Sequence, residues 1–389
     1  MNFTWQVPTK TLFGAGQLAH LHEQALPGKK ALIITSRGKS VRVNGYLAET
    51  IAQLQQAGVE SSVFSQVEPN PLKATVMQGG AAARAQHSDF LVALGGGSTI
   101  DAAKGIAVVA TNDGDLWDYI SFGTGKNKPI ANKPLPILAI PTTAGTGSET
   151  DMGGVITNPD TREKTPIKAP GLFPFLAIID PKLMVTVPAK LTAYQGFDAL
   201  FHNLEGYLSK KASLMSDMIT LQAVTCITQN LPKVIADGNN LATREAMAFG
   251  SYLGGLSMVV SSTVSEHSLE HSLSAFHQEL PHGAGLIMLS QAYFAFLIQK
   301  NICPERFVQL AKAMGRTQAT KPEEFLTALQ QLTEVCGVAA LKMSDYGITK
   351  EEFPHMAAIA KTAMGFLFAN DRLDITQEDC VAILTAAYK

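Results

Sequence analysis

The stretch DFLVALGGGSTIDAAKGIA, residues 89–107, decides how the first half of the chain folds. A run of Leu, Val and Ala, typical of a strand buried on both faces, leads into three glycines and then into a helical pattern that opens at Ser98 or Thr99. Glycines let the backbone approach a ligand closely, and the free amides at the start of a helix attract an anion. The pattern favours a phosphate-binding turn, although three glycines also suit a tight turn without a ligand, and GGGS is neither GxGxxG nor a P-loop.

The same alternation of strand and helix extends to both sides of this stretch. Short apolar runs with strand character lie at 31–35, 61–66 and 136–143, and amphipathic runs lie at 45–58 and 74–86. Strands rich in Ile, Val and Leu that alternate with helices imply βαβ units and a parallel sheet. The first half is therefore predicted to be an α/β nucleotide-binding domain.

The pattern changes after the strand-like FLAIID at 175–180. Beyond Pro181 and Pro188 long helical periodicity continues to the C-terminus, as in LTAYQGFDALFHNLEGYLS, and no comparable strand run appears. A single hydrophobic core stops growing at roughly 250–300 residues, so a chain of 389 residues favours two domains. We predict an α/β domain over residues 1–185 and an all-helical domain over residues 186–389.

The composition excludes several classes of function. The formal net charge is −2 and no long basic run is present, so the chain offers no footprint for nucleic acid or an anionic membrane. The start, MNFTWQVPTKTLFG, lacks the basic and apolar regions of a secretory signal, and no apolar run of about 18 residues could span a bilayer. The four cysteines are too scattered for a thiolate zinc site or a disulfide scaffold. We expect a cytoplasmic enzyme with reduced thiols and no nucleic-acid or membrane partner.

A second glycine loop, IPTTAGTGSETDMGGVI at 140–156, follows another buried strand and adds hydroxyl donors. Loops at the carboxyl ends of neighbouring parallel strands converge where open α/β sheets bind ligands. Together the two loops favour a dinucleotide over a simple turn. The candidate cofactor contacts in them are Gly95, Gly96, Gly97, Ser98, Asp101, Thr142, Thr143 and Thr146.

The helical half contains a cluster of histidines. TVSEHSLEHSLSAFHQELPHG, residues 263–283, holds His267, His271, His277 and His282. A single histidine on an apolar face is usually a satisfied core residue, but a cluster favours a metal site if a partner lies elsewhere. Spacing alone leaves open which of His267, His271 and His277 would bind.

A partner for the histidines lies earlier in the chain. Asp198 and His202 are four residues apart in a helical pattern, so their side chains share one face. Taken alone, this pair also fits a simple electrostatic contact within a helix. One carboxylate with two or three imidazoles suits iron, zinc or another first-row divalent metal better than magnesium or calcium. The sequence thus favours a transition-metal site in the helical half.

Several of these stretches together resemble the iron-containing, or group III, alcohol dehydrogenases. The likeness runs from FGAGQL near the start to LDITQEDCVAILTAA at the end. Its most distinctive parts are GGGSTIDAAK (95–104), PTTAGTGSE (141–149), LAIIDPKLMVTVP (176–188), GFDALFHNLEGYLS (196–209) and the histidine segment that ends in PHG. The resemblance implies a Rossmann-like domain followed by an all-α domain, as in dehydroquinate synthase, with nicotinamide and one divalent metal in a cleft between them. It also suggests a homo-oligomer, most simply a dimer.

The resemblance assigns roles to single residues. It makes four of them the ligands of the metal, namely Asp198, His202, His267 and His282. It places His271 beside the nicotinamide and the substrate, available for proton transfer, whereas His277 matches no family histidine and is expected to be a structural or surface residue. The metal is expected to be Fe²⁺, with Zn²⁺ as the alternative.

The chain also departs from the family pattern. Glu266 and Glu270 stand where the family usually has small or apolar residues, and the segment from His267 to His282 is one residue longer than in many relatives. These departures bear on the position of His282 and on the shape of the substrate pocket.

The loop ALIITSRGKSVRVNG at 31–45 bears on the choice of cofactor. An acidic side chain after the first strand accepts the ribose 2′-hydroxyl of NAD and repels a 2′-phosphate, whereas arginine and hydroxyl groups favour the phosphate. NAD-preferring relatives resemble one another in having Asp where this chain has Ser36. We predict that NADP(H) is preferred to NAD, with Ser36, Arg37 and Ser40 as contacts and Lys39 or Arg42 assisting. A solvated basic loop indifferent to the cofactor is the alternative.

The predicted activity is alcohol dehydrogenase or aldehyde reductase. A divalent metal would act as a Lewis acid while hydride passes between the nicotinamide and a small alcohol or aldehyde. A small or medium aliphatic substrate is favoured by apolar residues near the metal motifs, namely Phe197, Leu200, Phe201, Leu253 and Leu273. The alternatives are a glycerol-type polyol dehydrogenase, a dehydroquinate-synthase-like lyase that recycles bound NAD, and a non-catalytic nucleotide and metal sensor.

Overall fold

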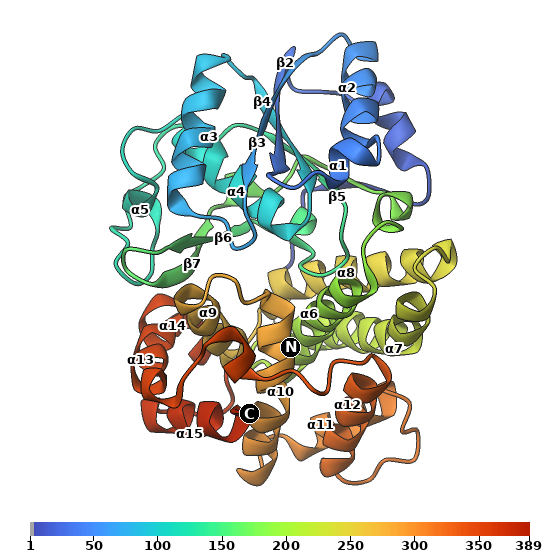
Figure 1. The fold of residues 1–389 in the computed structure, drawn as a ribbon, viewed down its shortest axis with the longest axis vertical. Coiled ribbons are helices and arrows are strands. Elements are labelled where there is room, and N and C mark those ends of the chain that lie inside the picture. Colours follow the sequence, from blue (N-terminus) through green and yellow to red (C-terminus); the bar gives the residue numbers. More distant parts are fainter. Residues whose placement is uncertain (1–3) are drawn as a thin grey trace. The chain divides into compact units, whose positions relative to one another are not determined.

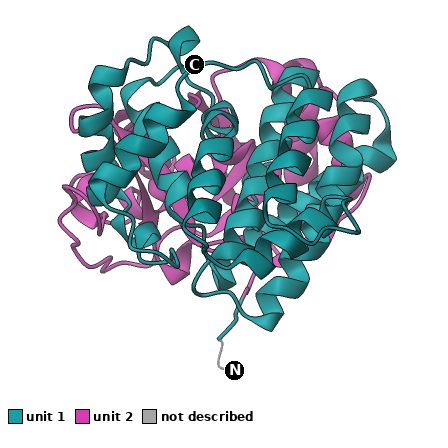
Figure 2. Ribbon diagram, turned by 90° about the horizontal axis from the view of Figure 1, so that it is seen from below, with its two compact units in different colours: residues 1–6, 144–147, 187–389 teal, residues 7–143, 148–186 magenta. Residues whose placement is uncertain are grey.

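The computed structural model describes residues 4–389 and confirms the predicted fold class (Figure 1). One unit, the sheet unit, comprises Val7–Thr143 and Ser148–Thr186. The other, the helical unit, comprises Val187–Lys389, Ala144–Gly147 and the described residues before Val7 (Figure 2). The sheet unit ends at Thr186. The four residues Ala144–Gly147, in the middle of the second glycine loop, belong to the helical unit, which the sequence did not indicate.

The sheet unit is built on a six-stranded sheet in which every pair is parallel. Its spatial order is β1 (Lys10–Phe13), β8 (Leu176–Ile179), β5 (Ile137–Pro141), β4 (Phe90–Gly95), β2 (Lys30–Ser36) and β3 (Glu60–Val67). Successive residues of a strand point to opposite faces, so Leu32 joins one hydrophobic core and Ile33 the other. Because both faces are covered, the inner strands are continuously apolar, as their sequences indicated.

Helices cover both faces of this sheet. The core on one face includes residues of α2 (Tyr46–Gln56), and the core on the other includes residues of α3 (Lys73–Ala85) and α4 (Gly97–Val109). After β3 the chain crosses to the far side of β2 and forms β4, so the strand order reverses between β2 and β4. Ile34 pairs with Ala93, and the segments after these two strands therefore leave the sheet at one edge. Open α/β sheets bind ligands at such a switch point.

Three strands were not predicted. The edge strand β1 has only four residues, KTLF, which are exposed or half-buried and show no apolar run. The strands β6 (Gly153–Asn158) and β7 (Glu163–Lys168) form a separate antiparallel hairpin. Their buried positions include polar residues such as Glu163, which accepts hydrogen bonds from Trp117 and Thr124. A strand whose buried side chains are polar lacks the hydrophobic pattern on which the prediction rested.

The helical unit contains α6 (Ala189–Leu208), α7 (Leu214–Ala236), α8 (Leu241–Val260), α9 (Ser265–Phe276), α10 (His282–Gln299), α11 (Pro304–Ala313), α12 (Glu323–Val335), α13 (Phe353–Ala363), α14 (Gly365–Phe368) and α15 (Gln377–Ala387). Helix α6 is buried from Gly196 to Leu208 without interruption, which explains why it is apolar on nearly every side. Phe197, Leu200 and Phe201 belong to the core of this unit, as does Leu273. These four residues are occupied in core packing, so the expected preference for an aliphatic substrate stays a prediction.

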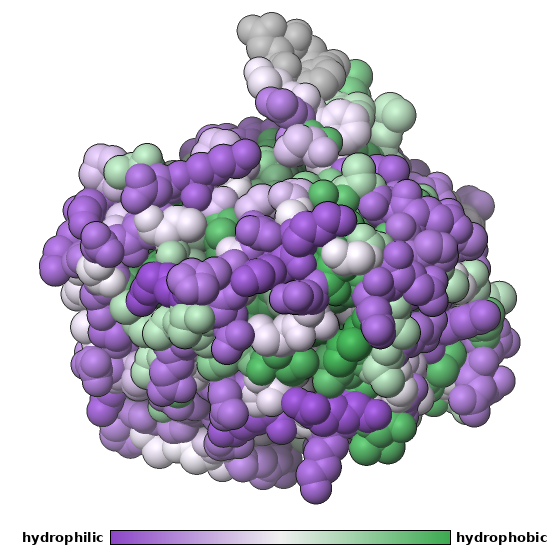
Figure 3. All heavy atoms as spheres, turned by 90° about the horizontal axis from the view of Figure 1, so that it is seen from above, coloured by the Kyte–Doolittle hydropathy of each residue, from purple (hydrophilic) through white to green (hydrophobic). Residues whose placement is uncertain are grey.

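No single helix within residues 4–389 is long and apolar enough to cross a membrane; only α8 and α9 taken together, across a bend of 108°, match that length and composition. The face seen in Figure 3 is mostly hydrophilic, and its hydrophobic side chains occur in small groups. All four cysteines are free, and Cys336 and Cys380 are buried.

Candidate metal centre and cofactor loops

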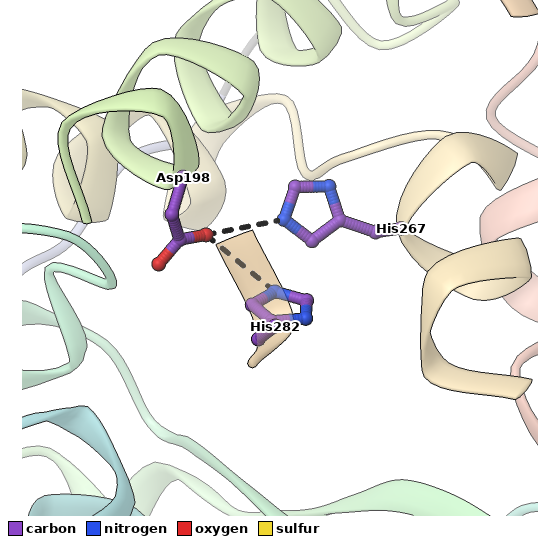
Figure 4. Close-up of side chains that lie close together, drawn as sticks. All are labelled: Asp198, His267 and His282. Atoms are coloured by element: carbon purple, nitrogen blue, oxygen red, sulfur yellow. Dashed lines mark ion pairs between the residues drawn. The ribbon is translucent and has the colours of Figure 1, made fainter. Parts of the chain in front are cut away.

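Three helices of the helical unit bring a carboxylate and three imidazoles together. Helix α6 supplies Asp198 and His202, α9 supplies His267, and His282 is the first residue of α10. The Oδ1 atom of Asp198 lies 3.8 Å from Nε2 of His267 and 3.5 Å from Nε2 of His282 (Figure 4). The same oxygen lies 3.5 Å from Nδ1 of His202. The structure thus brings ligand atoms of Asp198, His267 and His282 within 4.8 Å of one another, and it places His202, the fourth residue assigned by the family resemblance, beside Asp198.

These separations fit the ligands of one metal ion better than hydrogen bonds. Hydrogen bonds to oxygen from nitrogen span about 2.7–3.2 Å, whereas two ligand atoms at about 2.1 Å from a tetrahedral ion lie roughly 3.3 Å apart. Asp198 Oδ1, His202 Nδ1 and His267 Nε2 are buried and have no hydrogen-bond partner within the described chain. Such atoms are costly to bury unless a common partner satisfies them. A divalent cation is a partner of this kind, and imidazole with carboxylate suits iron or zinc.

The charges of the four groups are strongly coupled. Burial alone would raise the pKa of Asp198, but the imidazoles of His202, His282 and His267 outweigh burial and hold that pKa well below its usual range. Burial lowers the pKa of His202 to about 3, which keeps its imidazole neutral and able to bind a metal. For His267 the carboxylates of Glu205 and Asp198 outweigh burial and raise the pKa to about 10. Binding of a cation there must displace a proton.

Two glutamates that the sequence did not single out as functional hold the imidazoles from behind. Nδ1 of His267 contacts the Glu205 carboxylate, and Nδ1 of His282 contacts that of Glu270. A hydrogen bond at Nδ1 fixes the tautomer and turns Nε2 toward the metal. Glu205 could have been found from the sequence, because it follows Asp198 by seven residues and so lies two turns along the same helical face.

The remaining two histidines of the cluster differ in their surroundings. His271 is buried, and its ring centroid lies 5.2 Å from that of His282. Together with Glu270 and His282 it forms a second group whose potential ligand atoms lie within 4.8 Å of one another. His277 is instead the C-terminal cap of α9, and its Nε2 lies 3.2 Å from the carboxylate of Glu352. The structure thus puts His271 beside the candidate metal centre and gives His277 a partly buried contact with Glu352.

The segment Ala144–Gly147 of the second glycine loop packs against α6 and α8, and this close packing requires its glycines. A Cβ atom at Gly145 would lie 3.0 Å from Oδ2 of Asp198, and one at Gly147 would lie 2.6 Å from Cα of Gly255. Gly147 also has φ +63°, a conformation that favours glycine. Thr146, predicted as a cofactor contact, belongs to this segment within the helical unit.

Gly283→Ala is expected to destabilise the start of α10. The new Cβ would lie 2.7 Å from the carbonyl carbon of Tyr194, and a backbone atom cannot move aside as a side chain can. We expect the free energy of unfolding to fall by about 3 kcal/mol, the upper end for overpacking, together with loss of bound metal as His282 is displaced. Urea denaturation and elemental analysis measure both quantities. Gly365→Ala is the control, because no atom lies within 4 Å of its added Cβ. Equal effects of the two substitutions would contradict this account.

The glycine turn after β4 is partly explained by its own packing. A Cβ at Gly95 would lie 2.8 Å from Cβ of Thr99, and one at Gly96 would lie 2.9 Å from Oγ1 of Thr143. The amide of Thr142 donates to the carbonyl of Gly95 over 2.9 Å, which joins the two predicted glycine loops at the ends of β4 and β5. These strands are neighbours in the sheet, as predicted. Helix α4 begins at Gly97, so Ser98 lies in its first turn.

The predicted contact Asp101 has partners inside the protein. Its Oδ1 accepts from Ser148 Oγ over 2.6 Å, and its Oδ2 accepts from the amide of Val155 over 3.1 Å. Burial raises the pKa of Asp101 to about 6. One turn later the ammonium of Lys104 is completely buried, a feature that the sequence analysis missed. Asp101 therefore joins α4 to the segment 148–155.

The loop after β2 offers polar groups at the switch point. Ser36 ends β2 and is half-buried, Arg37 is exposed, and Ser40 begins the short helix α1 (Ser40–Val43). The three predicted contacts thus lie at the end of β2 and on the segment that follows it.

Comparisons with known proteins agree across both halves. A family model described as iron-containing alcohol dehydrogenase matches residues 8–181, and one described as Fe-containing alcohol dehydrogenase family, C-terminal, matches residues 192–388. The chain is 35% identical over 383 residues to 1,3-propanediol dehydrogenase of Klebsiella pneumoniae, covering 97% of this chain and 96% of that protein. It is 33% identical over 396 residues to a probable NADH-dependent butanol dehydrogenase of Bacillus subtilis, covering 99% of each.

Solved structures give the same picture. A crystal structure of an archaeal halo-thermophilic alcohol dehydrogenase from a Red Sea brine pool has a TM-score of 0.95 at 30% identity, covering 100% of this chain and 99% of that one. A 1,3-propanediol oxidoreductase has a TM-score of 0.89 at 35% identity, covering 100% of both chains.

Proposed function

The chain belongs to the iron-containing alcohol dehydrogenase family, and from that premise we propose that it interconverts small aliphatic alcohols and aldehydes with NADP(H) and one divalent metal. Alcohol oxidoreduction is the activity for which its relatives are named. One observation supports the role of the metal. Buried side-chain atoms of Asp198, His202 and His267 have no hydrogen-bond partner within residues 4–389, and their separations suit ligands of one ion.

Asp198, His202, His267 and His282 would hold the metal. When bound, the metal supplies a Lewis acid that polarises an aldehyde carbonyl in reduction and lowers the pKa of an alcohol in oxidation. Glu205 would keep Nε2 of His267 turned toward Asp198. Fe²⁺ is the ion we propose, in keeping with the family, and Zn²⁺ suits the same ligands.

His271 is the proposed proton carrier. It is buried next to His282, and its ring centroid lies 6.2 Å from that of His267, close to the metal ligands without belonging to the group around Asp198. An imidazole in such a place can give a proton to the substrate oxygen in reduction and take it back in oxidation. The two glycine loops and the segment after β2 are proposed to bind the dinucleotide at the edge of the sheet where Ser36 and Gly95 end their strands.

The function is tested by removing the metal and restoring it. Chelated enzyme should lose turnover and regain it anaerobically with Fe²⁺ or Zn²⁺, measured as NADPH oxidation with propanal, butanal and 3-hydroxypropanal, the aldehyde of 1,3-propanediol. Net consumption of NADPH excludes a lyase that recycles its cofactor, and turnover excludes a sensor. If chelation and restoration leave the rate unchanged, the proposed role of the metal is wrong. Cytoplasmic location and a homodimer stay predictions.

Ser36→Asp is expected to shift cofactor preference toward NADH by tenfold or more. A carboxylate there would repel the 2′-phosphate of NADPH and accept the 2′-hydroxyl of NADH, and about 1.4 kcal/mol between the two is a factor of ten. The ratio of kcat/KM for the two cofactors measures this shift. Ser36→Asn, similar in size but neutral, should change the ratio much less. An unchanged ratio in Ser36→Asp would refute the assignment of Ser36. Two relatives are named NADH-dependent and NAD-dependent, so the experiment also tests whether this chain differs from them.

A further inference from the structure

Glu270 contacts the candidate metal centre through the Nδ1 side of the His282 ring. It precedes His271 on α9, is completely buried, and its Oε2 accepts from Nδ1 of His282 at the start of α10, across the Pro281 break. The pair therefore ties the beginning of one helix to the middle of another. The side chain of His282 is 20% exposed. Without the hydrogen bond to Glu270, its imidazole ring would be free to change rotamer.

Gly285 makes this contact sterically feasible. A Cβ atom at position 285 would lie 2.7 Å from Cγ and 2.8 Å from Oε1 of Glu270. The glutamate side chain therefore occupies the space that any larger residue at 285 would need. A carboxylate at position 270 and a glycine at position 285 are complementary, although the two positions lie on different helices.

We propose that Glu270, accommodated by Gly285, is a positioning residue that holds His282 ready for the metal. The hydrogen bond at Nδ1 fixes the tautomer and leaves Nε2 facing Asp198 Oδ1 at 3.5 Å. A negative charge behind the ring also makes Nε2 a stronger ligand, so the pair should increase retention of the ion. The inference rests on the proposed function and specifies how this chain secures its fourth ligand.

The geometry favours this role over a second metal site. Glu270, His271 and His282 offer ligand atoms within 4.8 Å of one another. Two ligand atoms of one ion lie roughly 3.3 Å apart, however, and Glu270 Oε2 is in direct hydrogen-bond contact with His282 Nδ1. Only the other nitrogen of His282 has the separation expected of a co-ligand. The Glu270 carboxylate is therefore a hydrogen-bond acceptor for Nδ1 of His282, and Nε2 of the same ring remains for the metal.

The test measures metal affinity in the full-length protein. Zn²⁺ is titrated against a competing chelator, and bound metal per chain is counted by elemental analysis. Glu270→Ala should weaken Zn²⁺ binding about 10- to 100-fold, the usual effect of removing such a partner, and Glu270→Gln should weaken it less because the amide oxygen still accepts. Glu352→Gln is the control, because it alters another histidine–glutamate pair of the same unit, with His277.

A double-mutant cycle keeps the result independent of folding defects. Gly285→Ala should weaken binding as Glu270→Ala does, and the double variant should lose little more than either alone, because both disturb one contact. Equal affinity in wild type and Glu270→Ala would overturn the proposal while leaving the metal's role intact. Two Zn²⁺ per wild-type chain, falling to one in Glu270→Ala, would overturn it in favour of a ligand role. If the wild type binds neither Zn²⁺ nor, under anaerobic conditions, Fe²⁺, the proposed function itself fails.

Discussion

Asp198→Asn should leave the protein folded but without its metal, and should lower aldehyde turnover by about 1000-fold or more. Asp198 Oδ1 is the atom that the three imidazole nitrogens share, at 3.5, 3.5 and 3.8 Å. It is also the only carboxylate among the proposed ligands, so the amide would leave a divalent ion with neutral donors alone. Loss of a Lewis acid removes several kcal/mol of transition-state stabilisation, and each 1.4 kcal/mol is a factor of ten.

Metal content and NADPH oxidation test this expectation directly. Asp371→Asn is a matched control from the same unit: Asp371 is also buried, its Oδ1 accepts from the Tyr293 hydroxyl over 2.8 Å, and burial raises its pKa to about 7. Its amide counterpart keeps an acceptor for Tyr293 and should retain metal and most of the activity. Full metal occupancy with unimpaired turnover in Asp198→Asn would show that the ion binds elsewhere.

The sheet was predictable where burial was simple. Runs such as LVALG are apolar because both faces of the inner strands are covered. The predicted positions agree with the inner strands β2, β4, β5 and β8, and with β3, a mostly half-buried strand at the edge of the sheet. The edge strand β1 and the hairpin β6–β7 were missed because their residues are exposed or because their buried residues are polar. Hydrophobic pattern detects apolar burial, and it cannot detect burial satisfied by hydrogen bonds.

The metal centre was predictable in part. Helical spacing pairs Asp198 with His202 and His267 with His271, but only the family resemblance selected one set of four ligands. Glu205 had a signal in its spacing from Asp198, whereas Glu270 was noticed only as a departure from the family. The need for Gly283 and Gly285 comes from contacts of α10 with Tyr194 and Glu270, on other helices, and no local pattern encodes them.

The second large effect is expected in the sheet unit, at Lys104. Its Nζ shares three N–H donors among four acceptors: the carbonyl of Gly153 at 2.6 Å, Oδ1 of Asp151 at 2.8 Å, and both Oγ and the carbonyl of Ser148 at 2.7 Å. One buried ammonium thus holds the segment 148–153 onto α4. Lys104→Met has nearly the same length but no donor, and Asp151, whose side chain is 16% exposed, loses its counter-ion.

We therefore expect Lys104→Met to lower the free energy of unfolding by about 3–5 kcal/mol, the usual cost of removing one partner of a buried ion pair. Urea denaturation measures it. Lys126→Met provides the comparison, because Lys126 also pairs with an aspartate, Asp118 at 2.7 Å, but is 73% exposed. Solvent screens a surface pair of this kind, so its loss should be small. If the free energy of unfolding falls equally in both variants, the buried hydrogen bonds of Lys104 add no more stability than a surface pair. Segment 148–153 would then be held by other contacts.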